Sequence, residues 1–346
     1  MGLNIREIIP RREIEISQLK GKTVCVDAFN SLYQFLSSVR QADGTPLMDD
    51  KGNVTSHLSG IFYRNLTLLE QGIKLVYVFD GDAPDLKVKT HKKRKSARDL
   101  ASERYEEARQ DEDLVKMKSY SSKLLRLDDN MIKESKELLK AMGIMVVQAP
   151  SEGEAEAAYL CKENREVYAS VSQDYDSLLF GASRLIRNLT LARRRKTYSG
   201  YVEVKPEEII LKDVLKKLEI NLEQLICLGI IVGTDYNPKG IPRLGQKKAL
   251  KLVQEYGIPE EIFGVLEEKI ADLEEEDRFD WKEIFNLFEN HEVKDVDFKF
   301  PKIDGNKIKE ILVFRHNFSE ERVEKQLKRL EKLEHEKKQN SLSKWF

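Results

Sequence analysis

Cysteine and histidine are scarce in this chain of 346 residues. The three cysteines, Cys25, Cys161 and Cys227, are widely spaced among apolar neighbours, and the five histidines form no H-x-x-H or H-x-x-x-H pair. An odd number of cysteines without short spacing argues against a disulfide framework and against a zinc site. We therefore expect reduced core thiols in a cytoplasmic protein, and carboxylate ligands for any metal it binds.

The chain also lacks an excess of either charge and any long apolar run. Its 59 Lys and Arg residues balance 60 Asp and Glu residues, for a net charge of -1. A nucleic-acid partner must therefore be bound through local segregation of charge. The longest apolar run, residues 225–232, is too short to span a bilayer, so no membrane partner is expected. With 40% hydrophobic residues, the chain is predicted to be globular.

Short apolar runs alternate with helical patterns along the first two thirds of the chain. The runs 23–26, 75–79 and 166–171 are rich in β-branched and aromatic residues, as buried parallel strands are. Helices are predicted at residues 56–71, 129–142, 151–161, 207–218, 222–232 and 319–338, and residues 267–280 form an acidic surface stretch. This alternation predicts an α/β fold with a mainly parallel central sheet flanked by helices.

Acidic residues follow each predicted strand. The set with its neighbours comprises Asp27, Asp80, Glu152, Glu154, Asp174, Asp176 and Asp235. Because ligands of parallel sheets bind beyond the carboxyl ends of the strands, these acids are expected to converge. Crowded carboxylates repel one another unless hard cations lie among them, and two Mg²⁺ ions about 3.5–4 Å apart suit phosphodiester hydrolysis. The alternative is that each aspartate only caps the helix or turn that follows.

The two glutamates after Pro150 permit a second interpretation. Ser151 and Glu154 have the spacing of a capping box at a helix start. In addition, residues four apart share a helical face whereas residues two apart do not, so periodicity pairs Glu152 with Glu156. The spacing alone leaves both the capping role of Glu154 and the identity of the second functional glutamate open.

Five blocks of the sequence occur in an order that resembles a known family. They are Asp27-Ala28, Tyr77 to Gly81, Ala149 to Ala155, Gln173 to Leu178, and Gly233 to Tyr236. Together they resemble the structure-specific 5' nucleases, most closely the archaeal flap endonucleases, along the whole chain. The resemblance implies one ion among Asp27, Asp80, Glu152 and Glu154, and a second among Asp174, Asp176 and Asp235, with Mn²⁺ able to replace Mg²⁺. It also implies a free amino group at Gly2 near the site and stacking of Tyr33 on a base.

A block of basic residues has no acid between Leu86 and Arg98. It consists of Lys87, Lys89, Lys92, Lys93, Arg94, Lys95 and Arg98. Such a block is ordinarily a solvated helix face, but within a balanced chain it also indicates phosphate binding. The resemblance makes residues 83–128 a helical arch over the site, in which Lys87 and Arg94 contact the reacting phosphate and Lys92 and Lys93 bind DNA.

Glycines lie between two helical patterns at residues 240–249. Gly240 and Gly245 let backbone amides approach a phosphate, and Lys247 and Lys248 follow at the helix start. An ordinary turn is the alternative. The resemblance predicts a helix-hairpin-helix-like element at residues 222–256 that binds duplex DNA, in the family often through a K⁺ ion. Arg243 departs from that pattern, because it replaces the first glycine of the turn.

The tail has the spacing of a sliding-clamp-binding box. Gln339 is followed three residues later by Leu342 and then by Trp345 and Phe346, which a single helical turn places on one side. The alternative is that the aromatic pair folds back onto the core of the protein. We predict a nuclease domain at residues 1–330 and a clamp-binding tail at residues 331–346.

These features predict a magnesium-dependent endonuclease that cleaves 5' flaps at DNA junctions in replication and repair and leaves a 3'-hydroxyl and a 5'-phosphate. A 5' to 3' exonuclease activity is compatible with the same site, and the free enzyme is expected to be a monomer. The alternatives are a related exonuclease or RNA-directed nuclease, and a non-catalytic clamp-bound scaffold for branched DNA. The scaffold predicts DNA affinity without magnesium-dependent hydrolysis.

Overall fold

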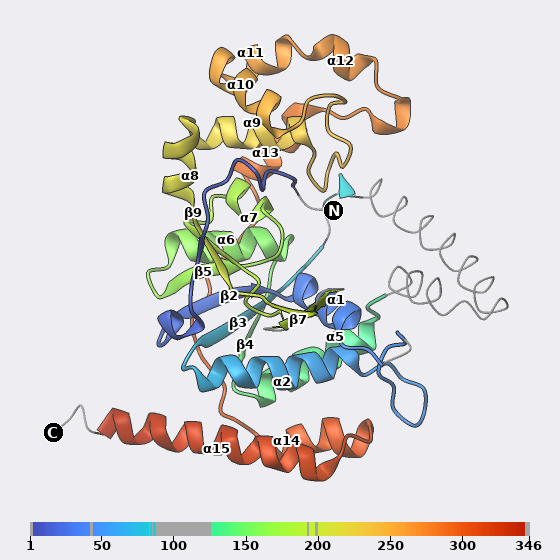
Figure 1. Ribbon diagram of the computed structural model, residues 1–346, viewed down its shortest axis with the longest axis vertical. Helices are drawn as coiled ribbons and strands as arrows, with labels where there is room; N and C mark the ends of the chain where they lie inside the picture. The colour runs from blue at the N-terminus through green and yellow to red at the C-terminus, as the bar shows by residue number, and fades with distance from the viewer. Residues whose placement is uncertain are drawn as a thin grey trace.

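A seven-stranded sheet runs through the middle of the molecule (Figure 1). The computed structural model describes residues 3–41, 44–82, 84, 86–87, 126–191, 194–197 and 200–342, with the backbone alone at 194–197, 201 and 334–342. The strand order is β1-β9-β6-β5-β2-β3-β4. Five consecutive strands of this order, which include the edge strand β4, are β2 (Thr23–Asp27), β3 (Lys74–Phe79), β4 (Met145–Gln148), β5 (Val167–Val171) and β6 (Arg184–Arg187).

These five strands are parallel to one another. β2 pairs with β3 on one side and with β5 on the other, β3 pairs with β4, and β5 pairs with β6. All residues of β2 are buried, which explains why the strand is a continuous apolar run before Asp27. The predicted α/β fold with a mainly parallel sheet is confirmed, as are the predicted strands at 23–26, 75–79 and 166–171.

The edge of the sheet beyond β6 is antiparallel, and here one helix prediction is wrong. Residues 207–210 form β9 (Glu207–Ile210), which pairs with β6 and with β1 (Arg12–Glu13), and helix α8 begins only at residue 211 (Leu211–Leu218). Two consecutive glutamates resemble a helix start, but both are buried here against arginines from distant parts of the chain. In a separate two-stranded sheet, β7 (Arg194–Thr197) pairs antiparallel with β8 (Gly200–Glu203).

Helices cover both faces of the sheet. Helices α1 (Ala28–Ser38), α2 (Ser56–Glu70) and α5 (Asp129–Ala141) pack with Val24 and Val26 on one face. Helix α6 (Gly153–Glu163) packs with Cys25 on the other, because successive strand side chains alternate between faces. Helices α14 (Gly305–Lys309) and α15 (Glu320–Leu342) lie outside α2 (Figure 1), with the π-helix η3 (Glu310–Arg315) between them.

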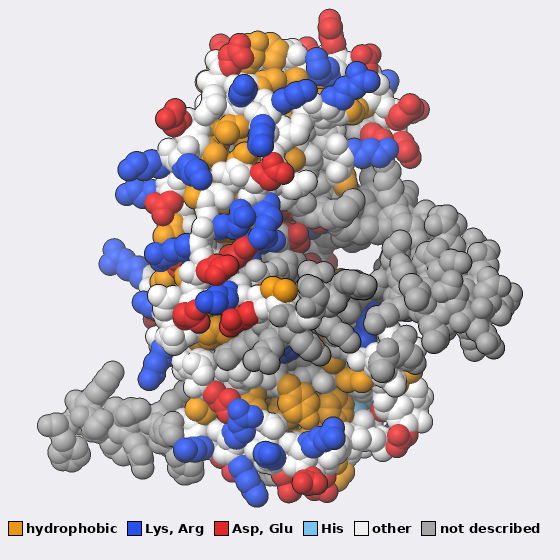
Figure 2. Space-filling model, viewed as in Figure 1, with side chains coloured by type: hydrophobic (Ala, Val, Ile, Leu, Met, Phe, Trp, Pro, Cys, Tyr) orange, Lys and Arg blue, Asp and Glu red, His pale blue; other side chains and the backbone are white. Residues whose placement is uncertain are grey.

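A second apolar core lies at the opposite end of the molecule from α15 (Figure 1). It joins α7 (Asp176–Leu179), α9 (Leu222–Val232), α10 (Gln246–Tyr256), α11 (Pro259–Gly264) and α13 (Trp281–Glu289) to residues of the N-terminal segment, including Leu3 and Ile5. The acidic stretch 267–280 contains α12 (Glu267–Ala271) and is mostly exposed, as predicted. Lys and Arg side chains are interspersed with Asp and Glu over the face shown in Figure 2.

The predicted helices at 56–71, 129–142, 222–232 and 319–338 are present within a few residues of their expected ends. Helix α6 begins at Gly153, two residues later than predicted. The predicted boundary at residues 330 and 331 falls within α15, so the division into nuclease domain and tail stays a prediction. The three cysteines are free and buried. Across the described ranges, no helix has the length and apolar character needed to cross a membrane.

Candidate active site

The carboxyl ends of β2 and β3 each present an aspartate. Asp27 is the last residue of β2 and caps α1, because its Oδ1 accepts a hydrogen bond from the Asn30 backbone amide at 3.0 Å. Asp80 follows β3, and its Oδ1 accepts a hydrogen bond from the Gly153 amide at 2.9 Å. Asp27 thus does cap α1, as the alternative interpretation expects. Besides being buried, the same carboxylate is also repelled by the charges of Asp80 and Asp174, which raise its pKa further.

Asn30 joins the end of β2 to the loop after β5. Its Nδ2 donates to Asp174 Oδ2 at 3.0 Å, and its Oδ1 accepts from the Gln173 amide at 3.3 Å. Asp176 begins α7, and the nearby backbone of Leu3 lowers the pKa of its carboxylate, against the larger effect of burial. The strand ends and the N-terminal segment therefore meet at one edge of the sheet.

Helix α6 contributes two glutamates to this edge. Glu152 is the N-cap residue of the helix but makes no side-chain capping hydrogen bond, and its carboxylate forms an ion pair with the Lys87 ammonium. Glu154 Oε1 accepts hydrogen bonds from the Ser177 amide at 2.9 Å and from the Ser177 hydroxyl at 2.6 Å. Glu154 therefore connects α6 to α7, next to Asp176.

The capping box that the spacing of Ser151 and Glu154 permits is not formed. The Ser151 hydroxyl donates to the Asp82 carbonyl oxygen at 3.2 Å, and the N-cap residue is Glu152, one position later, without a side-chain capping hydrogen bond. Glu156 Oε2 accepts from the Lys294 amide at 3.0 Å, next to Asp295. Glu154 therefore joins the acidic cluster, whereas Glu156, which periodicity pairs with Glu152, contacts the segment after α13.

One glycine is required by the close approach of α6 to β3. A Cβ atom at Gly153 would lie 2.6 Å from Asp80 Oδ1 and 3.1 Å from the Val78 carbonyl oxygen. Any side chain at this position would displace the Asp80 carboxylate from the Gly153 amide. The absence of a side chain at Gly153 thus allows the hydrogen bond that holds the Asp80 carboxylate in the cluster.

Burial and mutual repulsion dominate the electrostatics of the cluster. Burial, followed by the charge of Asp80, raises the pKa of Asp27 to about 8. Burial, followed by Asp235 and Asp174, raises the pKa of Asp176 to about 8. Burial also raises the pKa of Asp80, Glu152 and Glu154. Because each neighbour acts on several others, the seven predicted acids form one electrostatic unit.

Among the residues that the structure describes, Lys87 contributes a positive charge to this acidic cluster. Its side chain is 15% exposed, and its Nζ lies 5.5 Å from the centroid of the Tyr236 ring. Burial lowers the pKa of Lys87, but Glu152, Asp235 and Asp80 together outweigh burial and the net shift is upward. Lys87 is therefore a charged ammonium within reach of the acids.

The donor set fits hard divalent cations. Asp176 Oδ1 is buried and lacks a hydrogen-bond partner, as an oxygen reserved for a cation would. Carboxylate oxygens are the donors that Mg²⁺ and Mn²⁺ prefer. Within the described ranges, however, no three His, Cys, Asp or Glu side chains stand as a ready-formed metal group. The carboxylates are gathered at one edge, and the ion pair of Glu152 with Lys87 takes up one of them.

The residues predicted to bind DNA lie on several elements. Tyr33 on α1 is 40% exposed. Gly245 caps α10 without a side-chain hydrogen bond, and Lys247 and Lys248 are exposed on its first turn. Gly240 is buried instead, and a Cβ atom there would lie 2.5 Å from the Ile231 carbonyl oxygen. Close packing of the turn against α9 thus explains Gly240.

Arg243 occupies a left-handed backbone conformation, with φ at 66°. Glycine adopts such a conformation without steric cost, whereas arginine does not. This explains why a glycine is expected at this turn. Gly2, Lys92, Lys93, Arg94, Trp345 and Phe346 lie outside the described residues, and of Gln339 and Leu342 the backbone of α15 alone is described.

Sequence reasoning missed the residues that orient the cluster. Asn30 and Ser177 bind the carboxylates directly, and Arg187 on β6 donates to the Gln173 carbonyl oxygen and the Tyr175 hydroxyl. The position of Ser177 directly after Asp176 is the single local signal. The other contacts join residues more than ten positions apart, which no local pattern reveals.

Comparison with known proteins agrees with this geometry. Residues 4–101 match the XPG N-terminal domain and residues 143–235 match the XPG I-region. A protein of Thermococcus onnurineus named flap endonuclease 1 is 48% identical over 100% of this chain and 99% of its own length. A flap endonuclease 1 of Pyrococcus furiosus is also 48% identical, with the same coverage.

A solved structure shows the same fold. The flap endonuclease-1 from Methanococcus jannaschii is 39% identical to this chain, with a TM-score of 0.74 over 97% of this chain and 100% of that one. Both XPG regions and full-length relatives at nearly half identity therefore place the chain in one family. This chain belongs to the flap endonuclease family.

Proposed function

We propose that this protein is a structure-specific endonuclease that hydrolyses branched DNA near the base of a 5' single-stranded flap. The observation that carries the proposal is the convergence of buried acids from β2, β3, α6 and the loop after β5 at one edge of the sheet. The full-length relatives named flap endonuclease 1 supply the substrate class.

The acids would hold two divalent cations. By the family resemblance, Asp27, Asp80, Glu152 and Glu154 would surround one ion, and Asp174, Asp176 and Asp235 the other. Mg²⁺ is the expected ion and Mn²⁺ a substitute. When bound, such ions supply Lewis acidity and an activated water for phosphodiester hydrolysis.

The chain's own residues orient these carboxylates and balance their charge. Asn30, Gly153 and Ser177 donate to Asp174, Asp80 and Glu154 respectively. Seven carboxylates and two divalent ions leave a charge of about -3, which repels a phosphodiester unless cations lie near it. Lys87 faces the cluster and supplies one such charge. Arg94 and the amino group of Gly2 are proposed to supply two more.

Binding of the branch is proposed to use surfaces on both sides of the acids. Tyr33 would stack on a base next to the scissile phosphate, while Gly245, Lys247 and Lys248 would bind duplex phosphates at the start of α10. A K⁺ ion at this turn and phosphate contacts from Lys92 and Lys93 in an arch belong to the same proposal. Such contacts position DNA without reading its sequence.

The tail is proposed to bind a sliding clamp through Gln339, Leu342, Trp345 and Phe346. Aromatic anchors that enter a pocket contribute much of an interface's energy. Helix α15, which extends to Leu342, lies at the end of the molecule opposite α10 (Figure 1). The free enzyme is proposed to be a cytoplasmic monomer.

The test compares end-labelled 5'-flap, duplex and single-stranded DNA in the presence of magnesium and of a chelator. The proposal predicts fastest cleavage of the flap, close to the junction, only with the metal, and products with a 3'-hydroxyl and a 5'-phosphate. A scaffold protein would bind the flap in both conditions and cut it in neither. Equal cleavage of all three DNAs would indicate a less specific nuclease.

A further inference from the structure

Arg187 binds the backbone and side chains on both sides of Asp174. It is the last residue of β6, with a side chain 12% exposed. Its Nε donates to the Gln173 carbonyl oxygen at 2.9 Å, and its Nη1 donates to the Tyr175 hydroxyl at 2.6 Å. The guanidinium also lies 4.3 Å from the centroid of the Tyr175 ring. The loop that carries Asp174 and Asp176 is thus held by one planar cation.

Glu207 on β9 connects this cation to the N-terminal segment. Its Oε2 lies 3.4 Å from Arg187 Nη1, and its Oε1 lies 2.7 Å from Arg6 Nη2. Arg11 also reaches Glu207, with 3.5 Å between Arg11 Nε and Glu207 Oε1, and it donates to the Arg6 carbonyl oxygen at 2.7 Å. Glu207 therefore has three arginines around a side chain that is 11% exposed.

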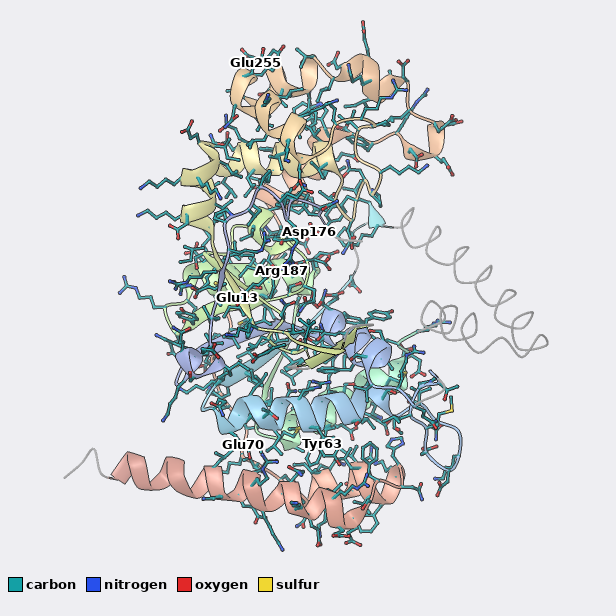
Figure 3. The ribbon with its side chains drawn as sticks, in the orientation of Figure 1. Glu13, Tyr63, Glu70, Asp176, Arg187 and Glu255 are labelled. Carbon is teal, nitrogen blue, oxygen red and sulfur yellow. The ribbon has the colours of Figure 1, made fainter. Side chains whose placement is uncertain are left out.

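The N-terminal segment returns to the acidic cluster. Leu3 and Ile5 are buried in the core around α9, and the Leu3 backbone lies close enough to the Asp176 carboxylate to lower its pKa, against the larger effect of burial. The ion pairs and hydrogen bonds thus link Arg6 to Glu207, Glu207 to Arg187, and Arg187 to the loop that carries Asp174 and Asp176. Figure 3 shows Arg187 and Asp176 together near the middle of the molecule.

We propose that Arg187, Glu207 and Arg6 are positioning residues, which hold the acidic loop 173–176 and the N-terminal residues 3–6 in one fixed relation. The proposal rests on the proposed function, because its consequence is correct placement of Asp174 and Asp176 for hydrolysis. The guanidinium of Arg187 donates hydrogen bonds to both Gln173 and Tyr175, and its plane also lies against the Tyr175 ring. A lysine has the charge but neither the second donor direction nor the planar face.

The chain contains a matched control on the same two strands. Arg184, at the other end of β6, lies 3.1 Å from Glu208 Oε1 through its Nε and 4.0 Å from the centroid of the Tyr168 ring. Arg12 pairs with the same Glu208. This second set also ties the N-terminal segment to β9, but it contacts Tyr168 within β5 and not the loop after it. A variant of Arg184 therefore shows the effect of losing an Arg–Glu–Tyr contact alone, whereas a variant of Arg187 also removes the contacts that hold the loop 173–176.

The experiment compares Arg187→Lys with Arg184→Lys. In the metal-free proteins, hydrogen–deuterium exchange should be at least about threefold faster at residues 3–6 and 173–177 for Arg187→Lys alone. On 5'-flap DNA, Arg187→Lys should lower kcat by about 10- to 100-fold, as loss of a residue that orients metal ligands does, and change KM less than about twofold. Arg184→Lys should keep kcat within about twofold of the wild type.

A second variant guards against misfolding. Glu207→Gln should show the same two effects as Arg187→Lys, and Glu208→Gln should show neither. Equal effects of the two arginine variants on exchange and kcat, or no effect of Arg187→Lys, would overturn the proposal. If the wild type fails to cut flaps, the proposed function is wrong, but the exchange comparison still decides whether Arg187 positions the loop.

Discussion

Glu154 and Glu156 lie two residues apart on α6, but their carboxylates bind different parts of the chain. Glu154 accepts from the amide and the hydroxyl of Ser177, whereas Glu156 accepts from the Lys294 amide. A helix turns about 200° between such positions, so their side chains diverge. The first glutamate joins the acidic cluster, and the second secures the segment that follows α13.

This divergence predicts opposite results for two conservative variants. Glu154→Gln should lower the flap cleavage rate by at least about 100-fold, because an amide is a poor cation ligand. Its melting temperature should not fall, because a buried and repelled carboxylate is removed. Glu156→Gln should cleave at nearly the wild-type rate, since its amide oxygen can still accept from Lys294. The reverse ranking in single-turnover assays would show that the metal ligands are misassigned.

The raised pKa values predict how pH affects the metal-free protein. Asp27 and Asp176 keep their protons up to about pH 8 when folded, whereas unfolded aspartates lose theirs near pH 4. Between these values the folded state binds more protons, so these groups lower the stability as pH rises from about 4 to about 8.

Magnesium should remove this penalty, because it binds the ionised form. The rise in melting temperature caused by magnesium should therefore grow from pH 5 to pH 8, and should be smaller in Asp27→Asn. Differential scanning calorimetry with magnesium or EDTA measures the difference. A magnesium effect that is absent, or that shrinks towards pH 8, would contradict metal binding by these acids.

The two glycines of the turn before α10 should differ in their effect on stability. Gly240→Ala should cost at least about 2 kcal/mol, because its φ of 56° disfavours alanine and the new Cβ would clash with the Ile231 carbonyl oxygen. Gly245→Ala should stay within about 1 kcal/mol, since space around it is open. Chemical denaturation of both variants tests this difference, and equal losses would refute the packing explanation for Gly240.

The site could be predicted from the sequence where it depends on strand position. Asp27, Asp80 and the Asp174 loop follow apolar runs that are recognisable because both faces of these strands are buried. The convergence of their acids then follows from the parallel order of the strands. Local pattern could not choose between Glu154 and Glu156, because the choice depends on which neighbour packs on each side of α6.

The failures have one physical cause, which is long-range pairing. Residues 207–210 resemble a helix start, but Arg6 and Arg12 neutralise their glutamates from about 200 positions away and permit a buried strand. The orienting contacts of Asn30 with Asp174 span 144 positions. Residue spacing carries no signal for either interaction.

Deletion of residues 339–346 should leave flap cleavage by the free enzyme unchanged, because α15 is anchored upstream by buried Val323, Leu327 and Leu330. The same deletion should remove stimulation by a sliding clamp, and Trp345→Ala combined with Phe346→Ala should do so too. Titration of purified clamp against each form measures this effect. Joint loss of basal activity and thermal stability would instead mean that the tail packs on the core.

Cleavage by Asp80→Asn and Asp174→Asn under single-turnover conditions, with flap DNA affinity measured in parallel, tests the acidic cluster most directly. Asparagine keeps the acceptor that Gly153 or Asn30 contacts, so the fold should be retained. Both variants should lose cleavage and bind the flap at least as tightly as the wild type, because removal of negative charge does not weaken phosphate attraction. Hydrolysis at nearly the wild-type rate by either variant would contradict a nuclease site at the carboxyl ends of β3 and β5.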